Sequence, residues 1–393
     1  MQKSKIDDQQ LTWAEIDLKA VKYNLRQIIK LTVKNKFNPP TRPRLKGVIK
    51  NVETIVPVIK ADAYGHGMGK IALLLDKEGV GFFGVSDIKE GIALRKTGIK
   101  KPILLFESTL ESQAKQIFEN QLIPTVCTLD LAESLNRYAQ RKKGRIDVHV
   151  KIDTGMGRLG IWHEEAFDFI KKISAYDHLR IMGIYTHFPA ADTDRVFTKK
   201  QLKYLYDLVT RLDRTGLIVP FIHAANSMGL AGYQTRIVNL ARPGLMLYGL
   251  YPHQDLRKKI QLKPVLSVRS RVIFLKKVKK GRSVSYGRTF FTKKDMLIAT
   301  VPIGYNDGYF RALSNQAFVL IGGRRCPVAG RVTMDQIMVD VSHLKTVQLG
   351  DLVTILGSQK KENISADELA KYAGTINYEI VCSLGNRLPR VYR

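Results

Sequence analysis

Short β-like runs alternate with helical runs through residues 55–240, and this alternation limits the folds that the chain can adopt. Eight strand candidates share short length and apolar composition: 55–59, 80–85, 102–106, 123–128, 145–152, 179–186, 219–223 and 237–240. Helical patterns lie between many of them, at 87–97, 110–120, 129–141, 164–174 and 199–215, after a first helix at 18–31. Repeated strand–helix units favour a parallel sheet, and eight of them favour a closed barrel over an open sheet. We therefore predict an α/β fold in which residues 1–262 form a (β/α)8 TIM-type barrel.

The pattern changes after Pro264. Apolar runs at 265–274, 296–302, 317–321, 337–341 and 352–356 are separated by glycines or basic turns, with no helical pattern between them. A helix begins only after Ser365, which together with Glu368 has the spacing of a capping box. Residues 263–393 are therefore predicted to form a second, mostly antiparallel β domain.

Composition excludes several classes of protein. The chain has 393 residues, of which 45% are hydrophobic, so it can form a large core and does not have the composition of a disordered protein. No apolar run approaches membrane-spanning length and the first residues contain no signal-like apolar stretch, so we expect a cytoplasmic protein with no membrane partner. Cys127, Cys326 and Cys382 are far apart and lack metal-ligand spacing, so we expect free thiols and no metal site.

The formal net charge is +29, and two segments concentrate it. Residues 34–50 contain six Lys or Arg and residues 257–294 contain fourteen, with no acid in either segment. Such segments can bind nucleic acid or an anionic membrane, or can be a solvated face of a very basic protein. Neither the interleaved aromatic residues of single-strand binders nor a DNA-reading motif accompanies them, so no nucleic-acid partner is expected. Steering of anionic small ligands is the favoured role of this charge.

Polar residues gather where the predicted barrel strands end. Five such positions follow strand candidates: Lys60, 153–158, His187, Asn226–Ser227 and Arg242. In barrels of this type the rim at the carboxyl ends of the strands carries the active site. An ammonium at the end of an apolar run must be paired, lose its proton or bond covalently, because leaving it unpaired in a low dielectric is unfavourable. A lone strand-end lysine would normally reach solvent, but Tyr64, Gly65 and Gly67 follow Lys60 and allow a ligand to approach the backbone closely.

The segment Lys60-Ala61-Asp62-Ala63-Tyr64-Gly65-His66-Gly67 resembles the cofactor-lysine signature of the alanine racemases, pyridoxal-phosphate enzymes built from a barrel and a C-terminal β domain. The likeness continues in the family's order through KIDTGMGRLG (151–160), THF (186–188), ANS (225–227), RPG (242–244), VSYG (284–287), PIGY (302–305), GRVTMD (330–335) and NYE (377–379). These segments cover nearly the whole chain, so the likeness is more specific than any one motif. It implies racemisation of L- and D-alanine with pyridoxal 5'-phosphate as cofactor, and a supply of D-alanine for cell-wall peptidoglycan.

Racemisation requires removal of a Cα proton and delivery of a proton to the opposite face. The resemblance implies that Lys60 forms the Schiff base with the cofactor and acts as the base on one face, while Tyr286 serves the other face. A free tyrosine has a pKa of about 10, so positive charge or hydrogen bonds must lower it for work at neutral pH. Arg242 is implied to face the pyridine nitrogen and to keep its own proton there. His187 is expected to orient Arg242.

The remaining cofactor and substrate contacts are carried over from the same resemblance. The phosphate is expected to meet uncharged donors, which belong to Tyr64, Asn226, Ser227, Gly244, Leu245 and Tyr378. Arg158 and the backbone of Met334 are implied to bind the substrate carboxylate, with Tyr305 in the channel that leads to the site. In the family the lysine that matches Lys151 can be carbamylated, which turns a cation into an anion that can pair with Arg158.

The resemblance also implies an assembly. Tyr286 and Met334 lie in the predicted β domain, and in the family they reach the site from the partner subunit, so a homodimer with shared active sites is expected.

Two features depart from the family's pattern. The segment 33–54 is longer and more basic than expected, and Pro189 stands where a small residue is usual.

Other functions remain open at this point. A barrel-type amino-acid decarboxylase shares the cofactor lysine, but its Glu-Pro-Gly-Arg phosphate signature and late Cys-Asp pair are absent. A racemase for serine or for several amino acids is disfavoured by Tyr378 and the segment 151–158. A small cofactor-handling barrel protein would lack the second domain, and a nucleic-acid binder rests on charge alone.

Overall fold

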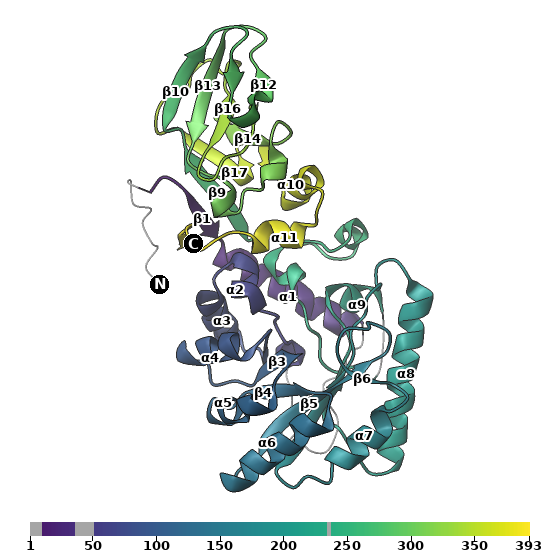
Figure 1. Ribbon diagram of the computed structural model, residues 1–393. Coiled ribbons are helices and arrows are strands. Elements are labelled where there is room, and N and C mark those ends of the chain that lie inside the picture. The colour runs from purple at the N-terminus through teal and green to yellow at the C-terminus, as the bar shows by residue number, and fades with distance from the viewer. Residues whose placement is uncertain (1–9, 36–50, 234–236) are drawn as a thin grey trace.

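The computed structural model describes residues 10–35, 51–233 and 237–393, so the basic segment 33–54 falls largely outside the described residues. The chain forms two lobes. Figure 1 shows a helix-covered barrel below and a group of β-sheets above, with the helix α11 and the strand β1 at the junction. The predicted fold class, a barrel followed by a mostly antiparallel β domain, is confirmed.

Six parallel strands form most of the barrel, in the order β2-β3-β4-β5-β7-β8. They are β2 (Phe83–Val85), β3 (Ile103–Ser108), β4 (Ile123–Val126), β5 (Ile146–Asp153), β7 (Leu179–Tyr185) and β8 (Phe221–His223), with the short β6 (Ile161–Trp162) beside β5. Isolated parallel bridges close the ring: Ile55 with Ala241, Val58 with Gly84 and His223 with Leu240. Two of the eight predicted strands are therefore present as short bridged segments.

Helices cover the outside of the barrel (Figure 1). They are α1 (Leu18–Lys34), α3 (Met68–Lys77), α4 (Ile88–Lys96), α5 (Ala114–Glu119), α6 (Leu129–Arg141), α7 (Ala166–Ile173) and α8 (Arg195–Arg214); α2 (Lys60–Gly65), α9 (Ser227–Gly232) and the 3-10 helices η1 (Asn51–Thr54), η2 (Glu111–Gln113), η3 (Leu245–Tyr248) and η4 (Gln254–Lys258) are short. Aspartates begin the two longest helices, because the side chains of Asp17 and Asp194 accept backbone N–H groups of the first turn.

The barrel interior is apolar away from the active-site rim. One buried cluster draws a residue from each of several barrel strands: Val56, Phe82, Leu104, Ile123, Phe221 and Leu240. The rings of Phe82 and Phe221 meet edge to face at 4.9 Å. The opposite strand faces pack against the helices in the main core. This filled interior leaves the rim as the place where polar side chains can gather.

The second lobe contains one large sheet and two small ones. The large sheet has the order β15-β14-β17-β9-β1-β19 with β18 beside β17, and the small sheets are β10-β13-β16 and β11-β12. The strands are β1 (Trp13–Ile16), β9 (Leu266–Arg271), β10 (Phe274–Val278), β11 (Ser283–Val284), β12 (Phe290–Phe291), β13 (Met296–Val301), β14 (Phe318–Ile321), β15 (Arg324–Pro327), β16 (Ile337–Asp340), β17 (Leu352–Gln359), β18 (Glu362–Ile364) and β19 (Arg390–Tyr392). The helices are α10 (Ala366–Ala373) and α11 (Asn377–Cys382), with 3-10 helices η5 (Tyr286–Arg288), η6 (Tyr305–Asp307) and η7 (Arg311–Leu313). Ser365 caps α10 as predicted, because its hydroxyl accepts the backbone N–H of Glu368 at 3.1 Å.

The two lobes are interleaved at their junction. Strand β1 pairs antiparallel with β9 and parallel with β19, so residues from both ends of the described chain lie side by side in the large sheet of the second lobe. Trp13, Ala14 and Ile16 are buried there. The chain then enters the barrel through α1. Sequence reasoning did not identify β1, because its partners β9 and β19 lie far along the chain from it.

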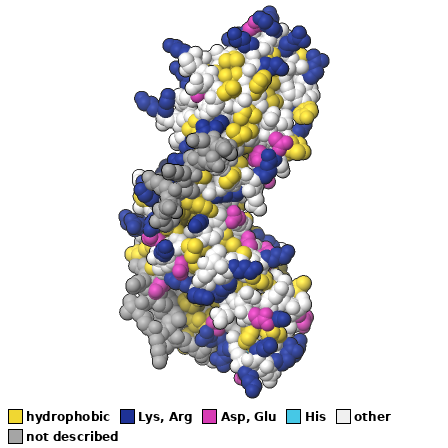
Figure 2. Space-filling view, turned by 90° about the vertical axis from the view of Figure 1, so that its left-hand side faces the viewer, with side chains coloured by type: hydrophobic (Ala, Val, Ile, Leu, Met, Phe, Trp, Pro, Cys, Tyr) yellow, Lys and Arg dark blue, Asp and Glu magenta, His cyan; other side chains and the backbone are white. Residues whose placement is uncertain are grey.

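Positive side chains are spread over the surface. Figure 2 shows Lys and Arg scattered over both lobes on the face that it displays, with few acidic side chains between them. Within the described part of the chain, no helix is long and apolar enough to cross a membrane. The same residues contain no group of His, Cys, Asp or Glu that could hold a metal ion.

Candidate active site

A cavity of about 710 Å³ opens at the rim of the barrel where α11 of the second lobe approaches. It gathers most of the site residues predicted from the sequence: Lys60, Tyr64, Lys151, Arg158, His187, Asn226, Ser227, Arg242, Gly244, Leu245 and Tyr378. These come from segments more than 300 residues apart in the chain. The cavity is therefore the candidate active site.

Lys60 is the first residue of a left-handed turn. The four residues 61–64 have φ between 51° and 55° and ψ between 42° and 53°. This conformation costs roughly 1–2 kcal/mol for each L-residue, so neighbouring groups must hold it. Glu90 accepts the backbone N–H of Ala61 at 2.6 Å, and Asp62 accepts the first backbone N–H of α3 at 2.7 Å. The turn delivers the lysine amine and the Tyr64 hydroxyl to the same cavity.

His66 holds the far end of this turn. Its Nδ1 lies 3.0 Å from the carbonyl oxygen of Ala63 and 2.8 Å from that of Tyr64. Carbonyls only accept hydrogen bonds, so Nδ1 carries the proton and Nε2 carries a lone pair. Burial lowers the pKa of His66 to about 4, so the ring is neutral at pH 7.

Uncharged donors line one end of the cavity. The Tyr64 hydroxyl lies so near Gly244 that a Cβ there would stand 2.5 Å from it, so only glycine leaves room. The Ser227 hydroxyl is 3.4 Å from the Gly244 nitrogen, and Asn226 caps α9. Burial raises the pKa of Tyr378 to about 12 and also raises that of Tyr64, so both phenols keep their protons as donors. Convergent donors without fixed charge suit a phosphate dianion.

Arg242 lies fully inside the barrel at the base of the cavity. Its guanidinium donates to the carbonyl of Thr186 at 2.8 Å and to that of Ala224 at 3.2 Å, and to Nδ1 of His223 at 2.6 Å. The predicted partner His187 is more distant, at 3.5 Å. Burial lowers the pKa of Arg242 to about 10, which still leaves it charged at pH 7.

A chain of two histidines continues from Arg242. Because Arg242 can only donate, His223 accepts at Nδ1 and donates from Nε2 to Nδ1 of His149 at 2.8 Å. Burial and the charge of Arg242 lower the pKa of His149 to about 3, and the pKa of His223 is also well below its usual value. The Tyr185 ring stacks on the His223 ring, with 4.6 Å between the two ring centres. The Arg242 guanidinium carbon lies 5.1 Å from the centre of the Tyr185 ring. Both rings in the histidine chain are therefore neutral and orient the guanidinium.

Sequence reasoning missed Tyr185, His149 and His223. Each lies within a strand pattern, where a polar ring is usually a satisfied core residue. The available signal was periodicity: His149 and Lys151 are two residues apart, so their side chains project from the same face of β5. The same spacing applies to Tyr185, the last residue of β7, which is two residues before the predicted rim residue His187.

Lys151 and Arg158 are presented by β5 and the loop that follows it. Lys151 is only 4% exposed, and its amine lies over the Tyr185 ring at 5.4 Å. Burial, Arg242 and Arg158 together lower the pKa of Lys151 to about 8. The buried Asp153 carboxylate accepts three successive backbone N–H groups of residues 155–157 at 2.8, 2.9 and 2.9 Å. This fixes the loop that carries Arg158.

Three predicted site residues do not line the cavity. Tyr286, Met334 and Tyr305 belong to the second lobe, where their side chains are 72%, 52% and 44% exposed. Backbone hydrogen bonds join the Tyr305 and Met334 loops, since the nitrogen of the residue after Tyr305 donates to the Met334 carbonyl at 3.0 Å. The Ser285 hydroxyl donates to the carbonyl of Arg331 at 2.6 Å, which ties the Tyr286 loop to the same face. Within one chain, the predicted site residues therefore lie in two places: most line the rim cavity, and Tyr286, Met334 and Tyr305 lie on the exposed surface of the second lobe.

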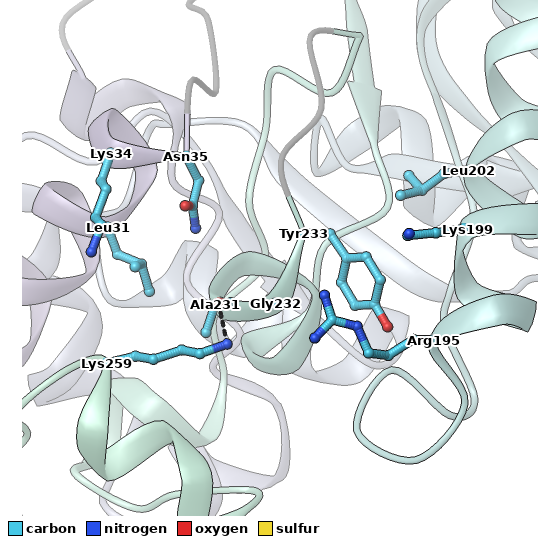
Figure 3. Close-up of a pocket in the computed structure, with 10 residues that line it drawn as sticks. All are labelled: Leu31, Lys34, Asn35, Arg195, Lys199, Leu202, Ala231, Gly232, Tyr233 and Lys259. Carbon is cyan, nitrogen blue, oxygen red and sulfur yellow. Dashed lines mark hydrogen bonds between the residues drawn. The ribbon is translucent and has the colours of Figure 1, made fainter.

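A second large cavity, of about 450 Å³, lies between α1, α8, α9 and η4. Figure 3 shows Arg195 and Lys199 turned toward Tyr233, and Lys259 reaching the carbonyl of Ala231 at 3.4 Å. Its lining is basic and could attract anions. It contains none of the residues predicted for the active site, so the rim cavity remains the candidate active site.

The fold and the site define a class of protein: a barrel enzyme with a β domain, in which a lysine on a strained turn shares the rim cavity with an anion cradle and a buried arginine. Comparisons with known proteins specify the family. Residues 43–252 match the family model of the N-terminal domain of alanine racemase, and residues 265–392 match that of its C-terminal domain. The alanine racemase of Halothermothrix orenii is 40% identical over 383 residues, which are 97% of each chain.

Solved structures agree. Alanine racemase from Clostridium difficile 630 superposes with a TM-score of 0.89 at 35% identity and covers 99% of this chain and 97% of its own. Alanine racemase from Bartonella henselae, solved with covalently bound pyridoxal phosphate, gives a TM-score of 0.84 at 28% identity, over 98% of this chain and 100% of its own. The chain therefore belongs to the alanine racemase family, and the predicted resemblance is confirmed.

Proposed function

We propose that the protein interconverts L-alanine and D-alanine with pyridoxal 5'-phosphate as cofactor. The observation that carries this proposal is the shared cavity of Lys60, Arg242 and the uncharged anion cradle. Family membership supports the choice of alanine. We propose that the D-alanine produced is used for the synthesis of peptidoglycan.

The residues of the cavity fit the proposed cofactor. Tyr64, Ser227 and the Gly244 backbone would hold its phosphate, and the close approach of Tyr64 to Gly244 explains why no side chain occupies that point. Asn226, Leu245 and Tyr378 would complete the cradle. Arg242 would face the ring nitrogen, and His187 would lie beside the ring. Lys60 would supply the amine that attaches the cofactor covalently.

Bound pyridoxal phosphate makes the Cα proton of an amino acid acidic enough to be removed. On one face Nζ of Lys60 takes or returns this proton, and on the other face the phenol oxygen of Tyr286 does so. Arg242 keeps its own proton because its pKa stays near 10 and its three near partners only accept hydrogen bonds. A guanidinium that keeps its proton would limit the charge that the cofactor ring can take up and would favour return of the proton to Cα.

Arg158 is proposed to bind the substrate carboxylate, together with the backbone of Met334, and Tyr305 to border the access channel. Lys151 is proposed to be carbamylated. Its amine, whose pKa is lowered to about 8, has an appreciable neutral fraction at pH 7 that can add carbon dioxide and release one proton. The resulting carbamate is an anion, and it would pair with Arg158 where an ammonium would repel it.

The proposal includes a homodimer with shared active sites. Tyr286 and Met334 are exposed on the second lobe, as expected of residues that enter the cavity of a partner subunit. Residues 1–262 would bind the cofactor and 263–393 would form the β domain, with β1 crossing into its large sheet. A cytoplasmic location is proposed as well, and the free state of Cys127, Cys326 and Cys382 is compatible with it.

The test is a chiral assay of purified protein with L-alanine and added pyridoxal phosphate, with L-serine, L-lysine and L-ornithine in parallel. D-Alanine as the main product is expected. Carbon dioxide release would assign the protein to the decarboxylases instead. Lys60→Ala should abolish both turnover and the covalent attachment of cofactor seen by mass spectrometry after borohydride reduction, whereas Lys263→Ala, a basic residue outside the cavity, should preserve both.

A further inference from the structure

Helix α4 begins beside the turn that carries Lys60. Its N-cap is Asp87, whose side chain accepts the backbone N–H of Glu90 at 2.8 Å. This bond fixes Glu90 in the first turn of the helix. A glutamate at this position commonly closes a capping box by accepting the N–H of the N-cap residue. The two carboxylate oxygens of Glu90 instead accept N–H groups of residues outside the helix.

The Glu90 carboxylate joins two segments of the catalytic rim. One oxygen accepts the backbone N–H of Ala61 at 2.6 Å, and the other accepts that of Ser86 at 2.7 Å. Ala61 and Ser86 line the catalytic cavity, whereas Glu90 is not among its lining residues. Hydrogen bonds to a carboxylate are about twice as strong as those between neutral groups. The carboxylate therefore ties the residue after Lys60 to the residue after β2.

The bond to Ala61 acts on Lys60 through the peptide that joins these two residues. A peptide unit is planar, so the direction of the Ala61 N–H also fixes the Lys60 carbonyl and the ψ angle of Lys60. His66 acts farther along the turn, where its ring meets the carbonyls of residues 63 and 64. Glu90 therefore holds the end of the left-handed turn that is nearest to the lysine.

We propose that Glu90 is a positioning residue for Lys60, and that its carboxylate sets the direction from which the Lys60 amine enters the cavity. The inference rests on the proposed function in one respect, because it takes Lys60 as the group that attaches the cofactor. Since Glu90 does not line the cavity, its removal should leave the space for the cofactor ring and phosphate unchanged. The strained turn should then relax, and attachment at Lys60 should become less favourable.

Two ligands separate these effects. Pyridoxal phosphate can bond to the Lys60 amine, whereas pyridoxamine phosphate has the same ring and phosphate but no aldehyde, so it binds only non-covalently. In titrations of the full-length protein, Glu90→Ala should weaken pyridoxal-phosphate binding about tenfold, because a charge-assisted hydrogen bond to the turn is lost, and pyridoxamine-phosphate binding by less than about threefold. Glu90→Gln keeps one acceptor oxygen and should give an intermediate result.

Asp147→Ala is the matched control. The Asp147 carboxylate accepts two N–H groups of Arg180 at 2.6 and 2.7 Å, the same lengths as at Glu90, and it does not line the catalytic cavity. This variant should bind both ligands like the parent protein. Thermal unfolding identifies a Glu90→Ala protein that fails to fold, in which case Glu90→Gln decides. Equal weakening of both ligands in a folded Glu90 variant, or weakening of neither, would overturn the proposal.

Hydrogen exchange gives a readout that needs no cofactor. The backbone N–H groups of residues 61–64, followed by mass spectrometry of the full-length protein, should exchange faster in Glu90→Ala, by about tenfold at Ala61. Unchanged exchange would show that Glu90 does not hold the turn. Failure of the proposed function would look different, because the parent protein itself would not attach pyridoxal phosphate at Lys60, and the exchange result would still decide the role of Glu90.

Discussion

Three buried histidines should make the protein sensitive to mild acid. His66, His149 and His223 have no exposed surface, and burial lowers the pKa of each well below the usual 6.5. In the unfolded chain the three histidines titrate near their usual pKa of 6.5. Between pH 6.5 and about 4 the unfolded state therefore binds more protons than the folded state. Because stability rises with pH wherever the unfolded state binds more protons, it must fall as the pH drops through this window.

The size of this loss follows from the shifts. Lowering the pH from 7 to 5 protonates almost all of an unfolded histidine of pKa 6.5 and costs the folded state roughly 2 kcal/mol. Three such groups cost about 6 kcal/mol, a large part of the 5–15 kcal/mol that typically stabilises a protein. Denaturant unfolding of the holoenzyme at pH 7, 6 and 5 measures the loss directly.

Variants separate the contributions of His149 and His223 from those of the other titrating groups. His149→Phe should reduce the stability lost between pH 7 and 5 by roughly 2 kcal/mol, and His149→Phe combined with His223→Phe by roughly 4 kcal/mol. Both variants can be less stable than the parent at pH 7, but the quantity compared is the change with pH. His253→Asn, at an exposed position, is the control. If the double variant lost as much stability between pH 7 and 5 as the parent protein, His149 and His223 could not be responsible for the pH dependence.

Three further predictions concern the proposed active site. Gly244→Ala should weaken pyridoxal-phosphate binding roughly tenfold, as measured by cofactor titration, because the added Cβ would stand 2.5 Å from the Tyr64 hydroxyl; unchanged affinity would place the phosphate elsewhere. Asp153→Asn should raise the KM for alanine about tenfold with a smaller change in kcat, because one carboxylate now holds the Arg158 loop through three backbone N–H groups; an unchanged KM would separate that loop from the substrate. With Tyr286→Phe, solvent deuterium should still exchange into one enantiomer of alanine far better than into the other, and equal losses from both would contradict the two-base assignment.

The barrel could be predicted from the sequence because each of its strand–helix units is encoded locally. Segments as short as the bridged residues 55–59 and 237–240 still gave recognisable apolar runs. The rim could be predicted for the same reason, since a polar residue after an apolar run marks the end of a parallel strand. Strand β1 could not, because its membership in the large sheet depends on pairing with β9 and β19, more than 250 residues away.

Within the site, the sequence indicated which side chains gather but not how they are oriented. The prediction that His187 orients Arg242 rested on resemblance, whereas the structure gives the shortest contact to His223, at 2.6 Å compared with 3.5 Å. That preference arises from the barrel geometry, which brings the end of β8 beside the Arg242 segment. The left-handed turn at 61–64 was equally hidden, because three of its four residues, Ala61, Ala63 and Tyr64, belong to types that rarely adopt positive φ.

That turn links the second lobe to the proposed active site. The turn is strained, and the barrel supplies only some of the contacts that hold it. Gly65 packs against the Val381 carbonyl so closely that a Cβ could not fit, and the Arg390 guanidinium donates to the Gly65 carbonyl at 3.2 Å. Both contacts come from the last residues of the chain. The position of the Lys60 amine therefore depends on docking of the β domain, and a barrel without that domain would lose these restraints on the turn and relax it toward ordinary backbone conformations.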